Sequence, residues 1–175
     1  FGGQNTLVGR GGDDTLLGGA DEDTLLGGND NDTLNGGGKA DVLEGGAGSD
    51  TMSGGGGLDT LEGGAGDDIM FGNGGSDTFI FNGLNAGNDE IRDFQDGVDV
   101  IQFNSNFVDR FADLDISGNG TDHVTINYGD NSIDLFGANP ITLTAADHGG
   151  HHVAASVTIL VADLDETLYL PLLFR

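Results

Sequence analysis

The first half of the chain carries one large apolar residue at every ninth position. From residue 9 to residue 80 these are Leu16, Leu25, Leu34, Leu43, Met52, Leu61, Met70 and Phe79. The period fits neither the 3.6-residue repeat of an amphipathic helix nor the continuous alternation of a long strand. A fixed short period is typical of a solenoid, in which each unit buries its apolar face against its neighbours. The pattern therefore predicts eight stacked units of nine residues.

Each unit divides into a turn and a strand. When Gly9 is position 1, positions 1 to 6 are rich in glycine, which reaches backbone conformations closed to other residues. Positions 7 to 9, usually led by threonine, predict a very short strand with position 8 pointing inward. Two units of nine then complete one flattened coil of 18 residues. The predicted fold is all-β, with two parallel sheets face to face.

Aspartate occupies position 6 of every unit. An 18-residue coil stacks these aspartates in two columns, one on each edge: Asp14, Asp32, Asp50 and Asp68, and then Asp23, Asp41, Asp59 and Asp77. Stacked carboxylates repel one another unless a cation lies between them. Calcium fits, because it takes about six to eight oxygen ligands in tolerant geometry, whereas magnesium demands tighter octahedra. Zinc prefers nitrogen or sulfur ligands, and the repeats contain no histidine or cysteine.

The nine-residue unit resembles the RTX (repeats-in-toxin) nonapeptide family, whose consensus is GGxGxDxUx with U a large apolar residue. The resemblance implies a right-handed parallel β-roll with calcium in its turns. It also implies that backbone carbonyls of positions 1 to 4 bind calcium together with the aspartates. The candidate carbonyl positions are Gly9, Gly11, Gly12, Gly18, Gly19, Ala20, Asp21, Gly27, Gly28, Asn29, Asp30, Gly36, Gly37, Gly38, Lys39, Gly45, Gly46, Ala47, Gly48, Gly54, Gly55, Gly56, Gly57, Gly63, Gly64, Ala65, Gly66, Gly72, Gly74 and Gly75.

The resemblance further implies that positions 1, 3 and 6 of one coil face positions 2, 4 and 6 of the next, or the reciprocal set. An example is Gly18, Ala20 and Asp23 facing Gly37, Lys39 and Asp41. Each column of four aspartates has three gaps, so the expected number of calcium ions is about six. A worn partial repeat precedes Gly9, and its Asn5 would support a seventh ion poorly. Some turn positions depart from glycine and are expected to strain the turn: Arg10, Asp21, Asp30, Lys39 and Asn73. The ammonium of Lys39 is expected to weaken the sites formed by Asp41.

Charge and composition exclude several classes of function. The formal net charge is −25 with only five basic residues, which argues against binding nucleic acid or an anionic membrane. There is no cysteine, so stability outside a cell must come from packing or from metal. Acidic residues interrupt the apolar stretch 157–174, so no stable membrane span is expected. Phe1 opens in mid-pattern without a signal peptide, so we expect the chain to be part of a longer one.

Residues 76–103 resemble the segment that follows the last repeats of many secreted RTX proteins. Their denser apolar set predicts a lid over the open end of the roll: Phe79, Phe81, Ile91, Phe94, Val98, Val100, Ile101 and Phe103. Asp93 and Asp99 are candidate further calcium ligands, although the favoured interpretation is that they are surface acids on a β-rich cap. We divide the chain into a roll over 1–80, a capping and secretion-associated region over 81–148, and a tail over 149–175. The tail is either a native secretion signal or unrelated to the module.

Four local patterns follow the lid. Residues 106–114 predict a short helix. Alternation over 123–128, and again at Ile133 and Leu135, predicts a hairpin. ITLTAAD over 141–147 resembles the close of RTX domains, with Thr144 as the cap of a last short helix. The cluster of His148, His151 and His152 is interpreted as a loop in preference to a zinc or nickel site, because no cysteine supports it.

No pattern supports catalysis. The chain has neither an H-E-x-x-H helix nor a G-x-S-x-G elbow, so the chain itself is not expected to be an enzyme. The resemblance implies a calcium-binding module exported by type I secretion machinery to the extracellular space or the bacterial cell surface. Without calcium it would be unfolded, because one apolar residue in nine cannot offset the cost of ordering so much glycine. Once folded, it would stabilise or display an N-terminal effector domain of its parent chain. The alternative is a calcium-dependent carbohydrate-binding or adhesin module, with a glycan as partner.

Overall fold

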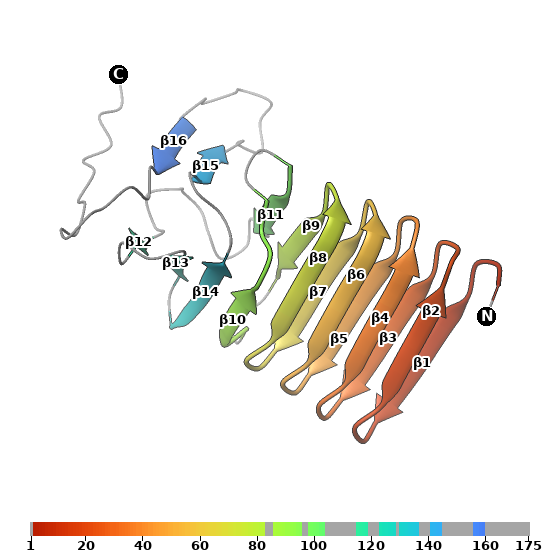
Figure 1. The fold of residues 1–175 in the computed structure, drawn as a ribbon. Helices are drawn as coiled ribbons and strands as arrows, with labels where there is room; N and C mark the ends of the chain where they lie inside the picture. Colours follow the sequence, from red (N-terminus) through yellow and green to blue (C-terminus); the bar gives the residue numbers. More distant parts are fainter. Residues whose placement is uncertain are drawn as a thin grey trace, which may run out of the picture.

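The computed structural model describes residues 2–82, 86–95, 98–103, 115–118, 123–128, 130–136, 141–144 and 156–159, and every regular element in them is a strand. Figure 1 shows the strands of the repeats stacked coil on coil from the N-terminal end. These strands are β1 (Thr6–Gly11), β2 (Thr15–Gly19), β3 (Thr24–Asn29), β4 (Thr33–Gly38), β5 (Val42–Ala47), β6 (Thr51–Gly57), β7 (Thr60–Ala65), β8 (Ile69–Gly75) and β9 (Thr78–Phe81).

Successive strands alternate between two parallel sheets. One sheet has the order β1-β3-β5-β7-β9, and the other contains β8-β6-β4-β2. Paired residues are 18 positions apart in the sequence, as in Leu25 with Leu43 and Met52 with Met70. The structure thus confirms the predicted all-β fold, a parallel solenoid in which two nonapeptides make one coil.

The strands are longer than the sequence predicted. A repeat strand such as β5 begins at position 7 and continues through position 3 of the next nonapeptide, so that Gly46 and Ala47 pair with Gly64 and Ala65. The prediction of three-residue strands was wrong because it took glycine at positions 1 to 3 as a sign of a turn. Pairing with both neighbouring coils holds these glycines in the sheet despite their low strand propensity.

The core of the roll is one apolar residue thick in each half-coil. The side chains of position 8 are buried, from Leu16 at 5% exposed to Phe79 at 0%. Positions 6, 8 and 1 all face inward because residues alternate along the extended chain. Each apolar side chain is therefore flanked by an aspartate on one side and a glycine on the other.

At the open end of the roll, where the sequence predicted a lid, residues after 80 extend the two sheets. Strand β10 (Asn88–Ile91) pairs with β8, and β11 (Val100–Phe103) pairs with β9, both in parallel. Val98 and Val100, which the sequence placed in the apolar set of the lid, are 40% and 53% exposed. The solenoid therefore continues past the nonapeptides.

The predicted hairpin is present. Strands β13 (His123–Tyr128) and β14 (Asn131–Phe136) pair antiparallel, and β14 also pairs in parallel with β10. Strand β12 (Asp115–Gly118) pairs with β13, while β15 (Ile141–Thr144) and β16 (Ser156–Ile159) form a separate two-stranded sheet. The helices predicted at 106–114 and after Thr144, and the histidine cluster, lie outside the described residues.

Apolar packing thickens at this end. The rings of Phe81, Phe103 and Tyr128 lie 5.2–6.2 Å apart, and Phe79 lies 6.3 Å from Phe94. In the hairpin, Ile133 and Leu135 are fully buried. Across the described residues, no helix is long and apolar enough to span a membrane.

Candidate metal centres in the aspartate columns

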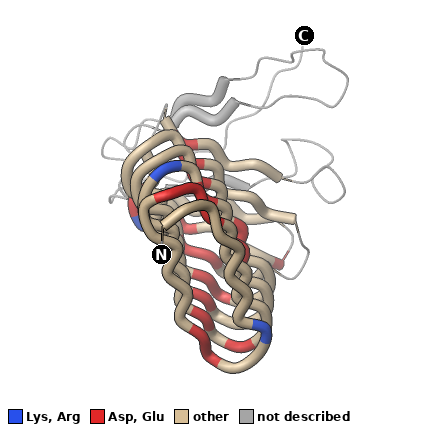
Figure 2. Tube along the Cα trace, turned by 90° about the vertical axis from the view of Figure 1, so that its right-hand side faces the viewer, with Lys and Arg blue, Asp and Glu red and all other residues tan. Residues whose placement is uncertain are grey.

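The turn of each nonapeptide brings its aspartate inside the roll. From Asp23 to Asp77 the position-6 aspartates are 0–4% exposed, and Asp14 in the first full repeat is half-buried. Figure 2, which looks along the coils, shows acidic residues recurring from coil to coil. The structure therefore places the repeat aspartates in the two columns that the 18-residue period predicts.

From Asp23 onward, one oxygen of each repeat aspartate is held by the backbone of the preceding coil. The N–H of Asp32 donates to Oδ1 of Asp50 at 2.7 Å, and the N–H of Asp59 donates to Oδ1 of Asp77 at 2.9 Å. The same bond recurs along both columns at 2.7–2.9 Å. A regular spacing of coils therefore fixes the orientation of these carboxylates.

The second oxygen of each carboxylate has no hydrogen-bond partner. Oδ2 is buried and unpartnered in all eight repeat aspartates. Leaving a buried charged oxygen unpaired costs on the order of several kcal/mol. Burial accordingly raises the pKa of Asp59 to about 6 and that of Asp68 to about 7, with neighbouring carboxylates adding to the shift. The columns need either protons or cations at these oxygens.

Backbone carbonyls line the gaps between coils. A Cβ added to Gly46 would collide with the carbonyl oxygen of Gly28, and one added to Gly66 would collide with that of Gly48. Carbonyls of positions 2 and 4 therefore point toward the following coil. The carbonyl of position 1 points back, since a Cβ on Gly18 would lie 2.5 Å from Gly36 O. Each gap therefore combines carbonyls of positions 2 and 4 of the earlier coil with that of position 1 of the later coil. This arrangement is the second, reciprocal set of the two that the sequence left open.

The donor set fits calcium. Within the described residues, no three histidine, cysteine, aspartate or glutamate side chains converge on one point, so side chains alone do not make a metal site. The gaps instead combine carboxylate and carbonyl oxygens, which are the ligands of a hard cation with flexible geometry. Glycine leaves the space open where other residues would place a side chain.

Non-glycine residues at positions 2 and 4 change the turn. At position 4, Asp30 and Lys39 have φ of 73° and 69°, whereas Gly48 and Gly57 have 136° and 158°. The larger values are essentially restricted to glycine, so the two side-chain-bearing residues adopt the left-handed helical region instead. Arg10 and Asn73 do the same at position 2. The expected strain is therefore present at these four residues, whereas the expectation was wrong for Asp21, whose φ is not positive.

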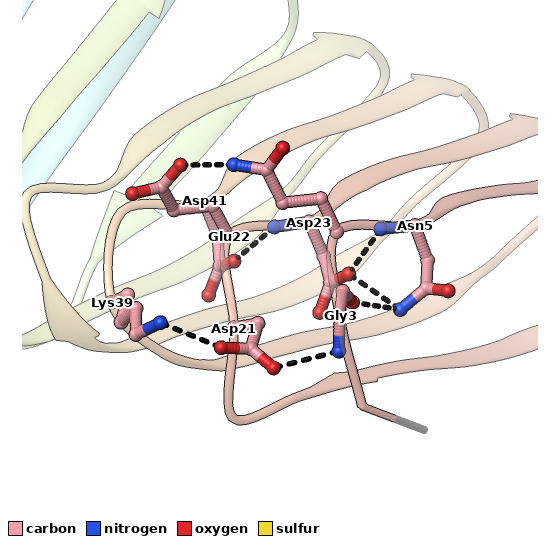
Figure 3. Close-up of polar contacts among 8 residues, drawn as sticks. Gly3, Asn5, Asp21, Glu22, Asp23, Lys39 and Asp41 are labelled. Atoms are coloured by element: carbon pink, nitrogen blue, oxygen red, sulfur yellow. Dashed lines mark hydrogen bonds and ion pairs between the residues drawn. The ribbon is translucent and has the colours of Figure 1, made fainter.

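Lys39 places an ammonium beside the second column (Figure 3). Its Nζ lies 2.6 Å from Oδ1 of Asp21 in the preceding coil, and Oδ2 of Asp21 accepts a hydrogen bond from Gly3 N–H at 2.6 Å. The hydrogen bond from Lys39 and then that from Gly3 lower the pKa of Asp21, and Asp21 raises the pKa of Lys39. A cation of the protein thus bridges the turns that contain Asp23 and Asp41.

In the partial repeat before Gly9, the amide side chain of Asn5 takes the place of an aspartate in the second column. Both the N–H and the side-chain amide of Asn5 donate to Oδ1 of Asp23, at 2.7 and 2.9 Å. The Asn5 side chain therefore brings a donor to Asp23 in place of a second carboxylate (Figure 3).

Asp99 and Asp93 both bind backbone N–H groups of the last repeat. Asp99 is 8% exposed, so its interpretation as a surface acid is wrong, and its Oδ1 accepts from Asp77 N–H at 3.0 Å. The half-buried Asp93 accepts from the N–H groups of Gly72 and Asn73 at 2.9 and 2.8 Å. Asp99 lies in the second column, whereas Asp93 caps a strand backbone.

The sequence analysis missed Asp89. This residue is 1% exposed, its Oδ1 accepts from Asp68 N–H at 3.0 Å, and its Oδ2 is unpartnered like those of the repeats. It follows Asp68 by 21 residues instead of 18, which breaks the period. The available signal was the shorter motif G-x-D-x-U, which recurs as GNDEI over 87–91 and GVDVI over 97–101.

Comparison with known protein families identifies the nonapeptide repeats. The family model for the RTX calcium-binding nonapeptide repeat (4 copies) matches residues 1–34, 26–61 and 53–79. A comparison with curated protein sequences gives no match. Among solved structures, the extracellular lipase LipA from Serratia marcescens is 16% identical with a TM-score of 0.34, a likeness too distant to carry an argument. The match covers 69% of this chain but only 38% of the lipase chain. Residues 1–79 of this chain are therefore RTX calcium-binding nonapeptide repeats.

Proposed function

We propose that this calcium-binding β-roll is a folding switch that stays unfolded at low calcium and folds when it meets extracellular calcium. The observation that carries the proposal is the double column of buried carboxylates with unpartnered Oδ2 atoms. At neutral pH and without a cation, these charges oppose folding in every coil. Cations between the coils remove the repulsion and pair the oxygens.

The proposed sites are the gaps between consecutive repeat aspartates in each column. In each gap, aspartate Oδ2 and the carbonyls of positions 1, 2 and 4 would hold the ion, with position 3 a further candidate. Three gaps in each of two columns give about six calcium ions. The gap beside Lys39 is proposed as the weakest of them, because its turn carries an ammonium, paired with Asp21, in place of glycine.

Calcium concentration would act as the switch. Extracellular modules bind calcium with dissociation constants of about 10⁻⁴–10⁻³ M, far above cytosolic calcium. Binding only to the folded state adds about 2.7 kcal/mol per site when calcium exceeds the dissociation constant a hundredfold. Inside a cell the chain would therefore remain unfolded, in the state that a narrow export channel requires.

The match of residues 1–79 to RTX repeats supports type I secretion to the extracellular space or the bacterial cell surface. Outside, the aromatic cluster of Phe81, Phe103 and Tyr128 would provide the apolar nucleus from which the roll folds. The folded module would then stabilise or display an N-terminal effector domain. We propose no catalytic role for this chain itself. A glycan array in calcium tests the carbohydrate-binding alternative, which requires calcium-dependent retention on a defined glycan.

The test is a calcium titration of the full chain, followed by far-UV circular dichroism with magnesium as control. We expect a cooperative change from coil to β-structure between about 10⁻⁴ and 10⁻³ M calcium. Magnesium at the same concentration should produce little change. A chain that is already fully β-structured in chelator at pH 7.5 would overturn the proposal.

A further inference from the structure

The first aspartate column extends one step beyond the nonapeptides, to Asp89. The N–H of Asp68 donates to Asp89 Oδ1, and the next bond of the ladder, from Glu90 N–H to Asp68 O, is 2.8 Å long. The corresponding ladder bond one coil earlier, from Ile69 N–H to Asp50 O, is 2.9 Å. Asp89 therefore lies where a position-6 aspartate of another coil would lie.

The backbone before Asp89 also reproduces a repeat turn. Gly66 N–H donates to Ala86 O at 3.0 Å, as Gly48 N–H donates to Ala65 O at 2.8 Å in the preceding gap. A Cβ on Gly87 would collide with the carbonyl of Gly66, as one on Gly66 would collide with that of Gly48. Residues 86–89 thus act as positions 3 to 6 of a nonapeptide although the sequence around them is not one.

The carboxylates on both sides of this gap each have one oxygen without a hydrogen bond. Oδ2 of Asp68 and Oδ2 of Asp89 are buried without a hydrogen-bond partner, and each residue is 1% exposed. A third carboxylate, that of Asp67, borders the gap and accepts the N–H of Asn88 at 2.9 Å. The gap therefore gathers negative charge and leaves two of its oxygens unpaired.

The equivalent gap in the second column is different. Oδ1 of Asp99 accepts from Asp77 N–H, and its Oδ2 accepts from Gln95 N–H at 2.8 Å. The Oδ2 atom of Asp99 thus has a backbone hydrogen-bond donor, whereas the Oδ2 atom of Asp89 has none. The two columns end in chemically distinct ways.

We propose a further calcium site between the turn of residues 63–68 and the turn of residues 86–89, with Asp68, Asp89 and the carbonyl of Gly66 among its ligands. Asp99 terminates the other column without an ion. The inference rests on the function proposed above, since it extends the same ligand chemistry beyond the family repeat. Because Asp89 lies in β10, which pairs with β14, the ion would join the roll to the hairpin.

The test counts bound calcium in the full chain by native mass spectrometry at saturating calcium, with circular dichroism as a check of folding. We expect Asp89→Asn to bind one ion fewer than the unmodified chain. The matched control, Asp99→Asn, should bind the same number as the unmodified chain. Loss of no ion, or of more than one, in Asp89→Asn overturns the site, as does loss of an ion in Asp99→Asn.

Two further variants separate the possible failures. Asp50→Asn, in the middle of the first column, reports on the proposed function. If it loses calcium while Asp89→Asn does not, only the additional site is wrong, and if the unmodified chain binds no calcium, both proposals are wrong. If Asp89→Asn does not reach the unmodified ellipticity, Gly87→Ala replaces it. That variant keeps the Asp89 carboxylate but places a methyl group against Gly66 O. It is also expected to bind one ion fewer than the unmodified chain, and any other number overturns the site.

Discussion

Glycine occupies position 1 of every full repeat because a side chain there would meet the carboxylate of its own repeat. A Cβ on Gly45 would lie 2.5 Å from Gly63 O and closer still to Asp50 Oδ2. Both atoms belong to the proposed calcium sites, so neither can move aside without disturbing the oxygens of a gap. The position is conformationally ordinary, since its φ is not positive, and it is restricted by space alone.

We predict that Gly45→Ala destabilises the calcium-bound roll by about 1–3 kcal/mol, the usual cost of overpacking a close-packed interior. The matched control is Gly56→Ala in the next repeat, where an added Cβ meets nothing within 4 Å. Thermal unfolding in saturating calcium measures both variants. Equal melting temperatures for the two would contradict the assignment of position 1 to a steric role.

We predict that Lys39→Gly tightens the weakest calcium site by several-fold. The substitution removes a cation beside the gap and restores the glycine that position 4 favours. Asp30→Gly separates the two causes, because it also restores glycine at position 4 but removes a negative charge. Calorimetric titration with calcium measures the affinities. Unchanged or weaker binding in Lys39→Gly would show that the ammonium does not compete with the ion.

At the scale of the element, much of the roll could be predicted from the sequence. The period of nine set the parallel pairing, the two sheets and the aspartate columns, because identical units can stack only in register. Strand length was not predictable from composition, since the glycines at positions 1 to 3 are held in the sheet by pairing on both sides and not by their own preference. Gly46 and Gly64, paired across β5 and β7, illustrate this.

The elements after residue 80 were harder to predict because insertions disrupt the period. Asp89 and Asp99 follow their column neighbours by 21 and 22 residues, so that neither falls on the nine-residue grid. The apolar residues Ile91 and Phe103 were recognised, but their pattern fits a lid as well as it fits two more strands. Only the pairing of β10 with β8 and β11 with β9 distinguishes these arrangements.

At the scale of the whole molecule, the buried carboxylates link folding to pH as well as to calcium. Burial raises the pKa of Asp59, Asp68 and Asp89 to about 6, 7 and 8, above the value of 3.8 expected in the unfolded chain. The calcium-free folded state thus binds protons more tightly than the unfolded state. Its stability is fully present below about pH 4 and is lost as the pH rises toward 8.

We therefore predict that in chelator the chain gains β-structure as the pH falls from 8 to 4. Calcium should reverse this dependence, because protons compete for the same oxygens, so the calcium midpoint should rise as the pH falls. Circular dichroism at a series of pH values, with and without calcium, measures both trends. If β-structure in chelator increased with rising pH, the buried carboxylates would not be the groups that oppose folding.

The hydrogen bonds of the columns all run one way: the N–H belongs to the earlier coil and the carboxylate to the later one, as in Asp32 and Asp50. In each column the aspartate N–H of a coil is thus bonded by the C-terminal neighbour, whereas the sheet ladder also donates in the opposite direction, as from Ile69 N–H to Asp50 O. Removing the first coil of such an array leaves every remaining aspartate N–H of the columns bonded to a carboxylate. Removing the segment that carries Asp89 and Asp99 leaves the N–H groups of Asp68 and Asp77 unmet. We therefore expect arrays of different length to differ in repeat number at the N-terminal end, while the segment that carries Asp89 and Asp99 supplies the last acceptor of each column.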